Sequence, residues 1–161
     1  MKISRIVLAF ACLGMLTGCS EYSMPKVAPN PQVIHISETD SKMLLTQAAT
    51  SMLTSSSSLN SQLLVYLEDT VKPTTDMKSS LTSGIKTTRD SIAKERDDLN
   101  AMYLASSLKE RQKNIVSVAD SMLESLDGML EAVENNDFTE LKTLQTQFNN
   151  DATLMQSYSN N

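Results

Sequence analysis

Apolar residues that recur every three or four positions are the feature of this chain that most constrains its fold. The pattern is most regular between Ile115 and Val133. Its members are Ile115, Ala119, Met122, Leu126, Met129 and Val133, flanked by Val118, Leu123 and Leu130. This spacing returns to one side of an α-helix at every turn, whereas a half-buried strand alternates at every second residue. The stretch is therefore predicted to be an amphipathic helix.

A second stripe of the same kind extends from Met77 to Met102. Its members are Met77, Leu81, Ile85, Thr88, Ile92, Glu95, Leu99 and Met102. The steps are heptad-like, with polar positions at Thr88 and Glu95. A helix is expected to begin after Pro73, because short polar side chains that can accept a hydrogen bond from the first turn follow it. These candidate N-cap residues are Thr74, Thr75 and Asp76.

The connection between these two helices is predicted to be a turn near Ala105–Ser107. Ser107 with Glu110 three residues later fits a capping box, in which each side chain satisfies a backbone N–H of the first turn. The alternative is one helix that continues through this region, since Ala105 and Leu108 both favour helix. The turn predicts four helices in all, and the continuous helix predicts three.

The segment from 38 to 70 carries a third stripe, which passes through a run of serines. Its members are Leu44, Ala48, Met52, Leu59, Leu63 and either Tyr66 or Leu67. The step from Met52 to Leu59 crosses Ser55–Ser58. Serine competes for backbone hydrogen bonds, so this run predicts either a kink or break, or a close approach of a neighbouring helix across small side chains. Pro73 is expected to end the element.

The last helix is predicted to follow a short turn at Asn135–Asn136. Asp137 is its expected N-cap, with Glu140 three residues on. Its apolar face consists of Leu141, Leu144, Phe148, Met155 and Tyr158. Residues 37–158 are therefore predicted to form an all-α domain, most simply an up-down bundle of four amphipathic helices, or alternatively of three. Residues 159–161 are expected to be a disordered tail.

The first eighteen residues have the composition of a secretory signal. Lys2 and Arg5 precede an apolar run from 6 to 16 that is too short to span a bilayer. The motif Leu16-Thr17-Gly18-Cys19 resembles the lipobox of bacterial lipoproteins, and all four of its positions match. The resemblance implies cleavage between Gly18 and Cys19, transfer of diacylglycerol to the Cys19 thiol, and acylation of the new amino terminus.

Lipidation at Cys19 has consequences for the anchor and for cysteine chemistry. Two or three acyl chains on one residue hold a protein stably to a bilayer, whereas one chain does so only marginally. Cys12 leaves with the signal, so no disulfide and no cysteine metal site is expected in the mature chain. Ser20 follows the cysteine, which by resemblance to enterobacterial sorting implies the outer membrane, facing the periplasm. In a cell with one membrane, the expected location is the outer face of the plasma membrane.

Residues 19–36 are predicted to be a flexible tether between the lipid and the bundle. Pro25, Pro29 and Pro31 favour extended conformations and block helix propagation. His35, the single histidine of the chain, lies in this stretch and is not expected to be a ligand. Cleavage removes Lys2 and Arg5, which lowers the net charge from −5 to −7. This charge disfavours nucleic acid as a partner.

Five carboxylates form an acidic ridge in the segment 115–134. They are Asp120, Glu124, Asp127, Glu131 and Glu134, at steps of four, three, four and three. Carboxylates at this spacing share one helix face and are able to attract a divalent cation or a cationic molecule. The favoured interpretation is structural, namely charge pairing with the preceding helix of a hairpin, where Lys78, Lys86 and Arg89 fall close to the same register.

Neither the methionines nor the nucleophilic residues of the predicted domain form a catalytic or metal-binding pattern. The methionines after cleavage are Met24, Met43, Met52, Met77, Met102, Met122, Met129 and Met155. They are scattered over the expected helices, which indicates core packing rather than copper binding. The predicted domain has no histidine base, no cysteine nucleophile and no glycine-rich phosphate loop. The sequence therefore predicts a non-catalytic protein without a cofactor.

The predicted function is that of a membrane-anchored envelope lipoprotein with a structural or adaptor role. In this role the bundle engages another envelope protein, or a second copy of itself, through an exposed helix face. The alternative is an envelope module that binds a divalent cation or a cationic molecule on the acidic ridge.

Overall fold

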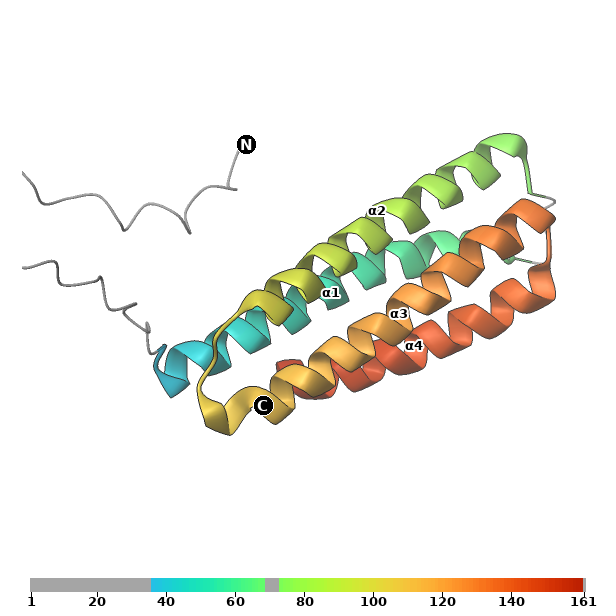
Figure 1. The fold of residues 1–161 in the computed structure, drawn as a ribbon. Coiled ribbons are helices and arrows are strands. Elements are labelled where there is room, and N and C mark those ends of the chain that lie inside the picture. The colour runs from blue at the N-terminus through green and yellow to red at the C-terminus, as the bar shows by residue number, and fades with distance from the viewer. Residues whose placement is uncertain (1–35, 69–72, 161) are drawn as a thin grey trace, which may run out of the picture. The chain divides into compact units, whose positions relative to one another are not determined.

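The computed structural model describes residues 36–68 and 73–160, and this part of the chain forms four α-helices (Figure 1). They are α1 (Glu38–Tyr66), α2 (Thr75–Ala101), α3 (Lys109–Asn135) and α4 (Phe138–Ser159), with a 3-10 turn η1 (Ser106–Leu108) between α2 and α3. No strand occurs among the described residues. The predicted all-α bundle is confirmed in its four-helix form. The predicted signal peptide, the tether up to residue 35 and Asn161 lie outside the described residues.

The helices are arranged so that each packs against its neighbours in the sequence. α1 also packs against α4, whereas α1 and α3 lie diagonally across the bundle and make few contacts. The end of α1, the start of α2 and the α3–α4 turn lie at one end of the bundle (Figure 1). The start of α1 and the α2–α3 connection lie at the other end (Figure 1). No helix in the described part of the chain is long and apolar enough to cross a membrane.

The core is formed by the apolar stripes of all four helices. The largest fully buried side chains are Phe148, Leu45, Met52, Leu59, Leu63, Leu81, Ile85, Ile92, Leu99, Ile115, Met122 and Leu126. Every member of the stripe predicted for α3, from Ile115 to Val133, is buried. Burial of one such Leu, Ile, Met or Phe side chain is worth about 1.5–3 kcal/mol, so these stripes are the main source of stability.

The serine run does not interrupt α1, so of the two predicted alternatives the break is wrong. Ser56 is buried, and its hydroxyl donates to the carbonyl of Met52 at 2.7 Å. The Ser55 and Ser91 hydroxyls are 2.9 Å apart, which confirms a close approach of α1 to α2 across small side chains. A hydroxyl that bonds to its own helix four residues back remains compatible with helix geometry.

Two details of α1 differ from the prediction. Leu45 is fully buried, whereas Leu44 is only half-buried. The buried face also includes Ser41 and Ala49. Because these side chains are small, the hydrophobic pattern did not show which side of the helix is buried at these positions. The helix ends at Tyr66 rather than near residue 70. The exposed Glu68 follows, and a negative charge is unfavourable at the carboxyl end of a helix.

Side chains cap three of the helices, two of them as predicted. Thr74 accepts from the N–H of Met77 at 3.2 Å, and Asp137 accepts from the N–H of Glu140 at 3.0 Å. Ser37 caps α1, which was not predicted. The capping box at Ser107 is wrong, because η1 precedes α3 and Leu108 stands at its N-cap without a side-chain bond.

Candidate functional site

The predicted lipidation site at Cys19 and the predicted cleavage position at Gly18 lie outside the described residues. The acidic ridge lies on α3, and all five of its carboxylates are on exposed residues. It therefore follows one outer face of the helix, opposite the buried stripe, as the spacing predicted. Two grooves lie on either side of α1, and the exposed face of α1 lies between them.

Arginines of α2 hold two members of the acidic ridge. Arg89 donates to Asp127 through two bonds, Nε to Oδ1 at 2.5 Å and Nη2 to Oδ2 at 3.2 Å. This hydrogen bond, together with the negative charge of Asp127, raises the pKa of the Arg89 guanidinium above its ordinary value. Arg96 donates from Nη1 to Asp120 Oδ1 at 3.0 Å. The ridge thus includes two ion pairs that join α2 to α3.

A third basic residue reaches the carboxyl-terminal end of the acidic ridge but does not bond to a carboxylate there. Lys78 donates from Nζ to the carbonyl of Glu134 at 2.9 Å and to Asn136 Oδ1 at 3.2 Å. Within the described ranges, no ion pair joins Lys86 to the ridge, nor involves the side chains of Glu124 or Glu131. Charge pairing with α2 therefore accounts for Asp120 and Asp127, and the remaining carboxylates are solvated.

The ridge does not gather its carboxylates into a metal site. Over residues 36–68 and 73–160, no three Asp, Glu, His or Cys side chains are close enough to hold one ion. The steps of three and four residues distribute the carboxylates along the helix axis, at about 1.5 Å of rise per residue. Calcium requires six to eight oxygen ligands around one point, which a single helix face does not supply.

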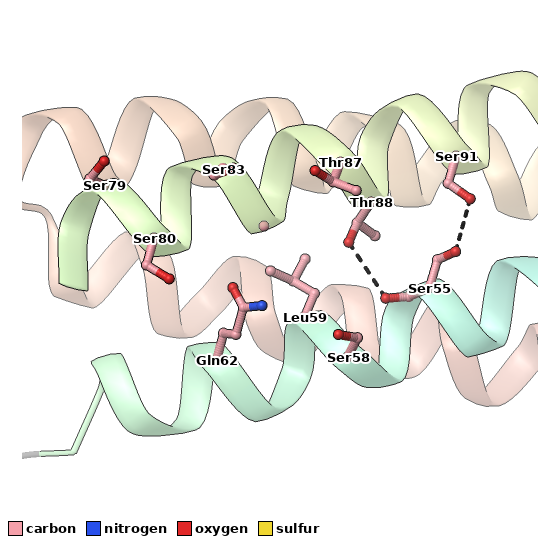
Figure 2. Close-up of a pocket in the computed structure, with 11 residues that line it drawn as sticks. Ser55, Ser58, Leu59, Gln62, Ser79, Ser80, Ser83, Thr87, Thr88 and Ser91 are labelled. Atoms are coloured by element: carbon pink, nitrogen blue, oxygen red, sulfur yellow. Dashed lines mark hydrogen bonds between the residues drawn. The ribbon is translucent and has the colours of Figure 1, made fainter. Parts of the chain in front are cut away.

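A hydroxyl-lined groove of about 530 Å³ runs between α1 and α2 (Figure 2). Its lining residues are Ser55, Ser58, Leu59, Gln62, Ser79, Ser80, Ser83, Gly84, Thr87, Thr88 and Ser91. Thr88 donates to the carbonyl of Ser55 at 3.5 Å, and Ser51 donates to Glu95 Oε1 at 3.0 Å. The serines of α1 therefore partner the two polar positions of the α2 stripe.

A second groove, of about 460 Å³, lies between α1 and α4. Its lining residues are Leu53, Ser56, Ser57, Asn60, Ser61, Leu64, Asn149, Ala152, Thr153 and Gln156. Asn60 donates from Nδ2 to Asn149 Oδ1 at 2.5 Å, and Gln145 donates to Asn60 Oδ1 at 3.4 Å. Like the groove on the α2 side, this groove has no charged residue in its lining.

The exposed face of α1 between the two grooves is the surface that sequence reasoning missed. We call it the outer strip of α1, and its members are Met43, Gln47, Thr50, Thr54, Ser57, Ser61 and Leu64. All seven residues are exposed, and no charged residue occurs in the sequence from Met43 to Leu67. The exposed fractions of Met43 and Leu64, at the two ends of the strip, are 56% and 65%. A search of each predicted helix for uncharged exposed faces would have found it.

The described part of the chain is thus a four-helix bundle with ion pairs between α2 and α3 and uncharged side chains on both sides of α1. Comparison with known proteins adds no family to this description. No family model, no curated protein and no solved structure matches the chain. The acidic ridge and the outer strip of α1 are the two surfaces on which a function can be based.

Proposed function

We propose that this protein is a lipid-anchored lipoprotein of a bacterial envelope whose bundle binds a protein partner and performs no catalysis. The anchor is proposed from the four matching positions of Leu16-Thr17-Gly18-Cys19. Acylated Cys19 holds the chain in the bilayer, and the proline-containing tether connects it to α1. The proposed location is the periplasmic face of the outer membrane in a two-membrane envelope, and otherwise the outer face of the plasma membrane.

The observation that carries the binding role is the outer strip of α1. A helix face that remains in water in a soluble bundle normally carries charged side chains. Here the face is uncharged over its whole length and exposes Met43 and Leu64, and the neighbouring Val65 has an exposed fraction of 58%. Partner-binding surfaces are depleted of charge at their centre, so this composition fits a contact surface.

The alternative, a cation-binding role for the acidic ridge, has less support. Asp120 and Asp127 are each paired with an arginine of α2. A cation that bound to these carboxylates would have to displace Arg96 and Arg89 from them. In the described ranges no third acidic side chain lies within reach to compensate for that loss.

Replacement of the lipidated cysteine tests the anchor. We expect Cys19→Ser to move the protein from the membrane fraction to the soluble fraction of the envelope, because no acyl chain remains. Cys12→Ser is the matched control, since that residue lies in the segment that is cleaved, and it should leave the protein in the membrane fraction. Retention of Cys19→Ser in the membrane fraction would contradict the proposed anchor.

Crosslinking in intact cells tests the binding role. We expect the anchored protein to be crosslinked to a partner, and Thr54→Lys, in the middle of the outer strip, to abolish that product. Glu124→Lys, on the exposed face of α3, is the matched control and should leave the product intact. A product lost equally in both variants, or a complete absence of product, would contradict a binding role for α1.

A further inference from the structure

We propose that the partner of the outer strip of α1 is the outer strip of a second copy of this chain. This inference rests on the proposed function, because it names the partner of the same surface. Four features of that surface support it: its spacing, the state of its hydroxyl groups, its charge relative to the rest of the molecule, and its size.

The spacing of the outer strip is that of a helix-pairing surface. Its members follow one another at steps of four, three, four, three, four and three residues. This heptad period keeps one line of side chains facing a second helix that packs nearly parallel or antiparallel to it. The strip lies away from the buried face of α1, which packs in the bundle through Leu45, Met52 and Leu59. α1 thus has two heptad-spaced faces, and only one is occupied within the bundle.

Three of the four hydroxyl groups of the outer strip, those of Thr50, Thr54 and Ser61, are already partnered within α1. Thr50 donates to the carbonyl of Thr46 at 2.8 Å, and Thr54 donates to that of Thr50 at 2.9 Å. Ser61 donates to the carbonyl of Ser57 at 3.4 Å. Burial of a hydroxyl donor without a partner is costly, whereas these donors keep their bonds when water is removed. The strip can therefore be buried without stranding these donors.

The charge distribution selects a second copy over a charged partner. The net charge is −5 for the whole chain and −7 after the proposed cleavage, so two copies repel each other, and most strongly where their acidic ridges approach. Contact through the outer strips keeps α3 of each copy on the far side of its own bundle, diagonal to α1. A partner with charged side chains would have to desolvate them against a surface that offers no opposite charge. An uncharged strip of the same length on a second copy brings no charged side chain that would have to be desolvated.

The size of the surface is sufficient for a homodimer. From Met43 to Leu64 the strip is about 32 Å long, at about 1.5 Å of rise per residue. With the uncharged α2 and α4 residues that line the two grooves, its width is about 20 Å, or roughly two helix diameters. The two copies together would bury about 1,300 Å², near the lower end of the range for specific interfaces. Anchoring of both copies in one bilayer raises their effective concentration, which favours association at this size.

Disulfide trapping of the full-length lipidated protein in its own membranes tests the proposal. Thr54 is the middle member of the outer strip, so pairing along the strip brings the two Thr54 positions together in parallel and in antiparallel arrangements. We expect Thr54→Cys to form a disulfide-linked dimer in high yield under mild oxidation. Glu124→Cys, at an exposed position of α3, is the matched control and should remain largely monomeric. Equal yields for the two variants, or no dimer from Thr54→Cys, would overturn the proposal.

A charge-swap experiment separates this proposal from the broader binding role. Thr54→Lys and Thr54→Glu should each lose the dimer, detected by amine crosslinking, whereas co-expression of the two should restore a mixed dimer. Capture of a different envelope protein, with no dimer at all, would overturn self-pairing and leave the binding role intact. Protection of Thr54→Cys from a thiol reagent by neutral lipid vesicles, again without dimer, would overturn it in favour of a membrane surface.

Discussion

Arg89 of α2 and Asp127 of α3 form a two-pronged ion pair across the bundle surface. The Nε–Oδ1 distance is 2.5 Å and the Nη2–Oδ2 distance is 3.2 Å. The second α2–α3 ion pair, Arg96 with Asp120, lies seven residues further along each helix in the antiparallel sense. The two pairs therefore repeat with the heptad period of the helices and match the register of α2 against α3.

The Arg89–Asp127 pair is expected to make a small, salt-sensitive contribution to stability. Both side chains are about half exposed, with exposed fractions of 40% and 53%, so solvent screens their attraction. A double-mutant cycle with Arg89→Ala and Asp127→Ala should give a coupling free energy of about 0.2–1 kcal/mol. The coupling should decrease in high salt, because the Debye length becomes shorter. A coupling free energy that salt leaves unchanged would contradict this interpretation. The same cycle with Lys94→Ala and Asp98→Ala provides a comparison, because that ion pair lies within one helix.

Gly84 is expected to be a position where alanine stabilises the protein. A Cβ at Gly84 would lie 2.1 Å from Gln62 Oε1, an oxygen that is buried without a hydrogen-bond partner. Gln62 is only half-buried, so its amide can rotate away without the loss of a bond. The gain in helix propensity from Gly to Ala is about 1 kcal/mol. Gly84→Ala should therefore raise the unfolding free energy by about 0.5–1 kcal/mol in denaturant titrations.

The matched glycine variant is Gly128→Ala on α3. Its Cβ would lie 3.0 Å from Leu144 Cδ1, a carbon that packs against the core. Displacement of a packed side chain has a cost, so the gain at Gly128 should be smaller than the gain at Gly84. A lower stability for Gly84→Ala than for the natural chain would show that the Gln62 amide cannot move.

The fold was predictable because the apolar positions of α2, α3 and α4 carry an unambiguous period. All six predicted members of the α3 stripe are buried, and the α2–α3 connection lies in the predicted region. α1 was less certain, because Ser41, Ala49 and Ser56 are buried there while Leu64 is exposed. Hydrophobicity alone does not identify the buried face of a helix when small and hydroxyl residues form part of it.

The candidate site was predictable only in part. Heptad spacing placed the acidic ridge on one exposed face and Arg89 near it, but the pairing of Arg96 with Asp120 depends on the geometry at the α2–α3 turn. Here η1 replaces the predicted Ser107 cap and sets how far α3 is displaced along α2. The outer strip of α1 was missed because neither the hydrophobic period nor the charge pattern marks it. This face is defined by the absence of charged residues.

Glycine is expected to be the only residue that replaces Asn136 without a clear loss of stability. It ends α3 in the left-handed region at φ 56°, and the following N–H, from Asp137, donates to the carbonyl of Ala132 at 2.8 Å. Side chains with a Cβ pay about 1–2 kcal/mol in this conformation, with Asn better tolerated. Asn136→Ala should therefore lower the unfolding free energy by about 1 kcal/mol. Asn136→Gly also loses the bond from Lys78 but should be nearly neutral, and equal losses in the two variants would contradict the conformational argument.

Tyr66 is expected to make the protein sensitive to alkaline pH. It has an exposed fraction of 3%, and its ring stacks on Phe138 with the centroids 5.9 Å apart. Burial raises the pKa of the Tyr66 phenol above its ordinary value of 10.0, so the unfolded chain ionises first. The unfolding free energy should therefore fall as the pH rises above about 10. Tyr66→Phe has no ionisable group and should become more stable relative to the natural chain over that range.

Lys94, whose pKa is raised by its bond to Asp98, contributes equally in both proteins and cancels in the comparison. Tyr103→Phe, at a position 85% exposed, is the control and should follow the natural chain at every pH. If the curve for Tyr66→Phe also runs parallel to that of the natural chain, the Tyr66 phenol is free to ionise in the folded state.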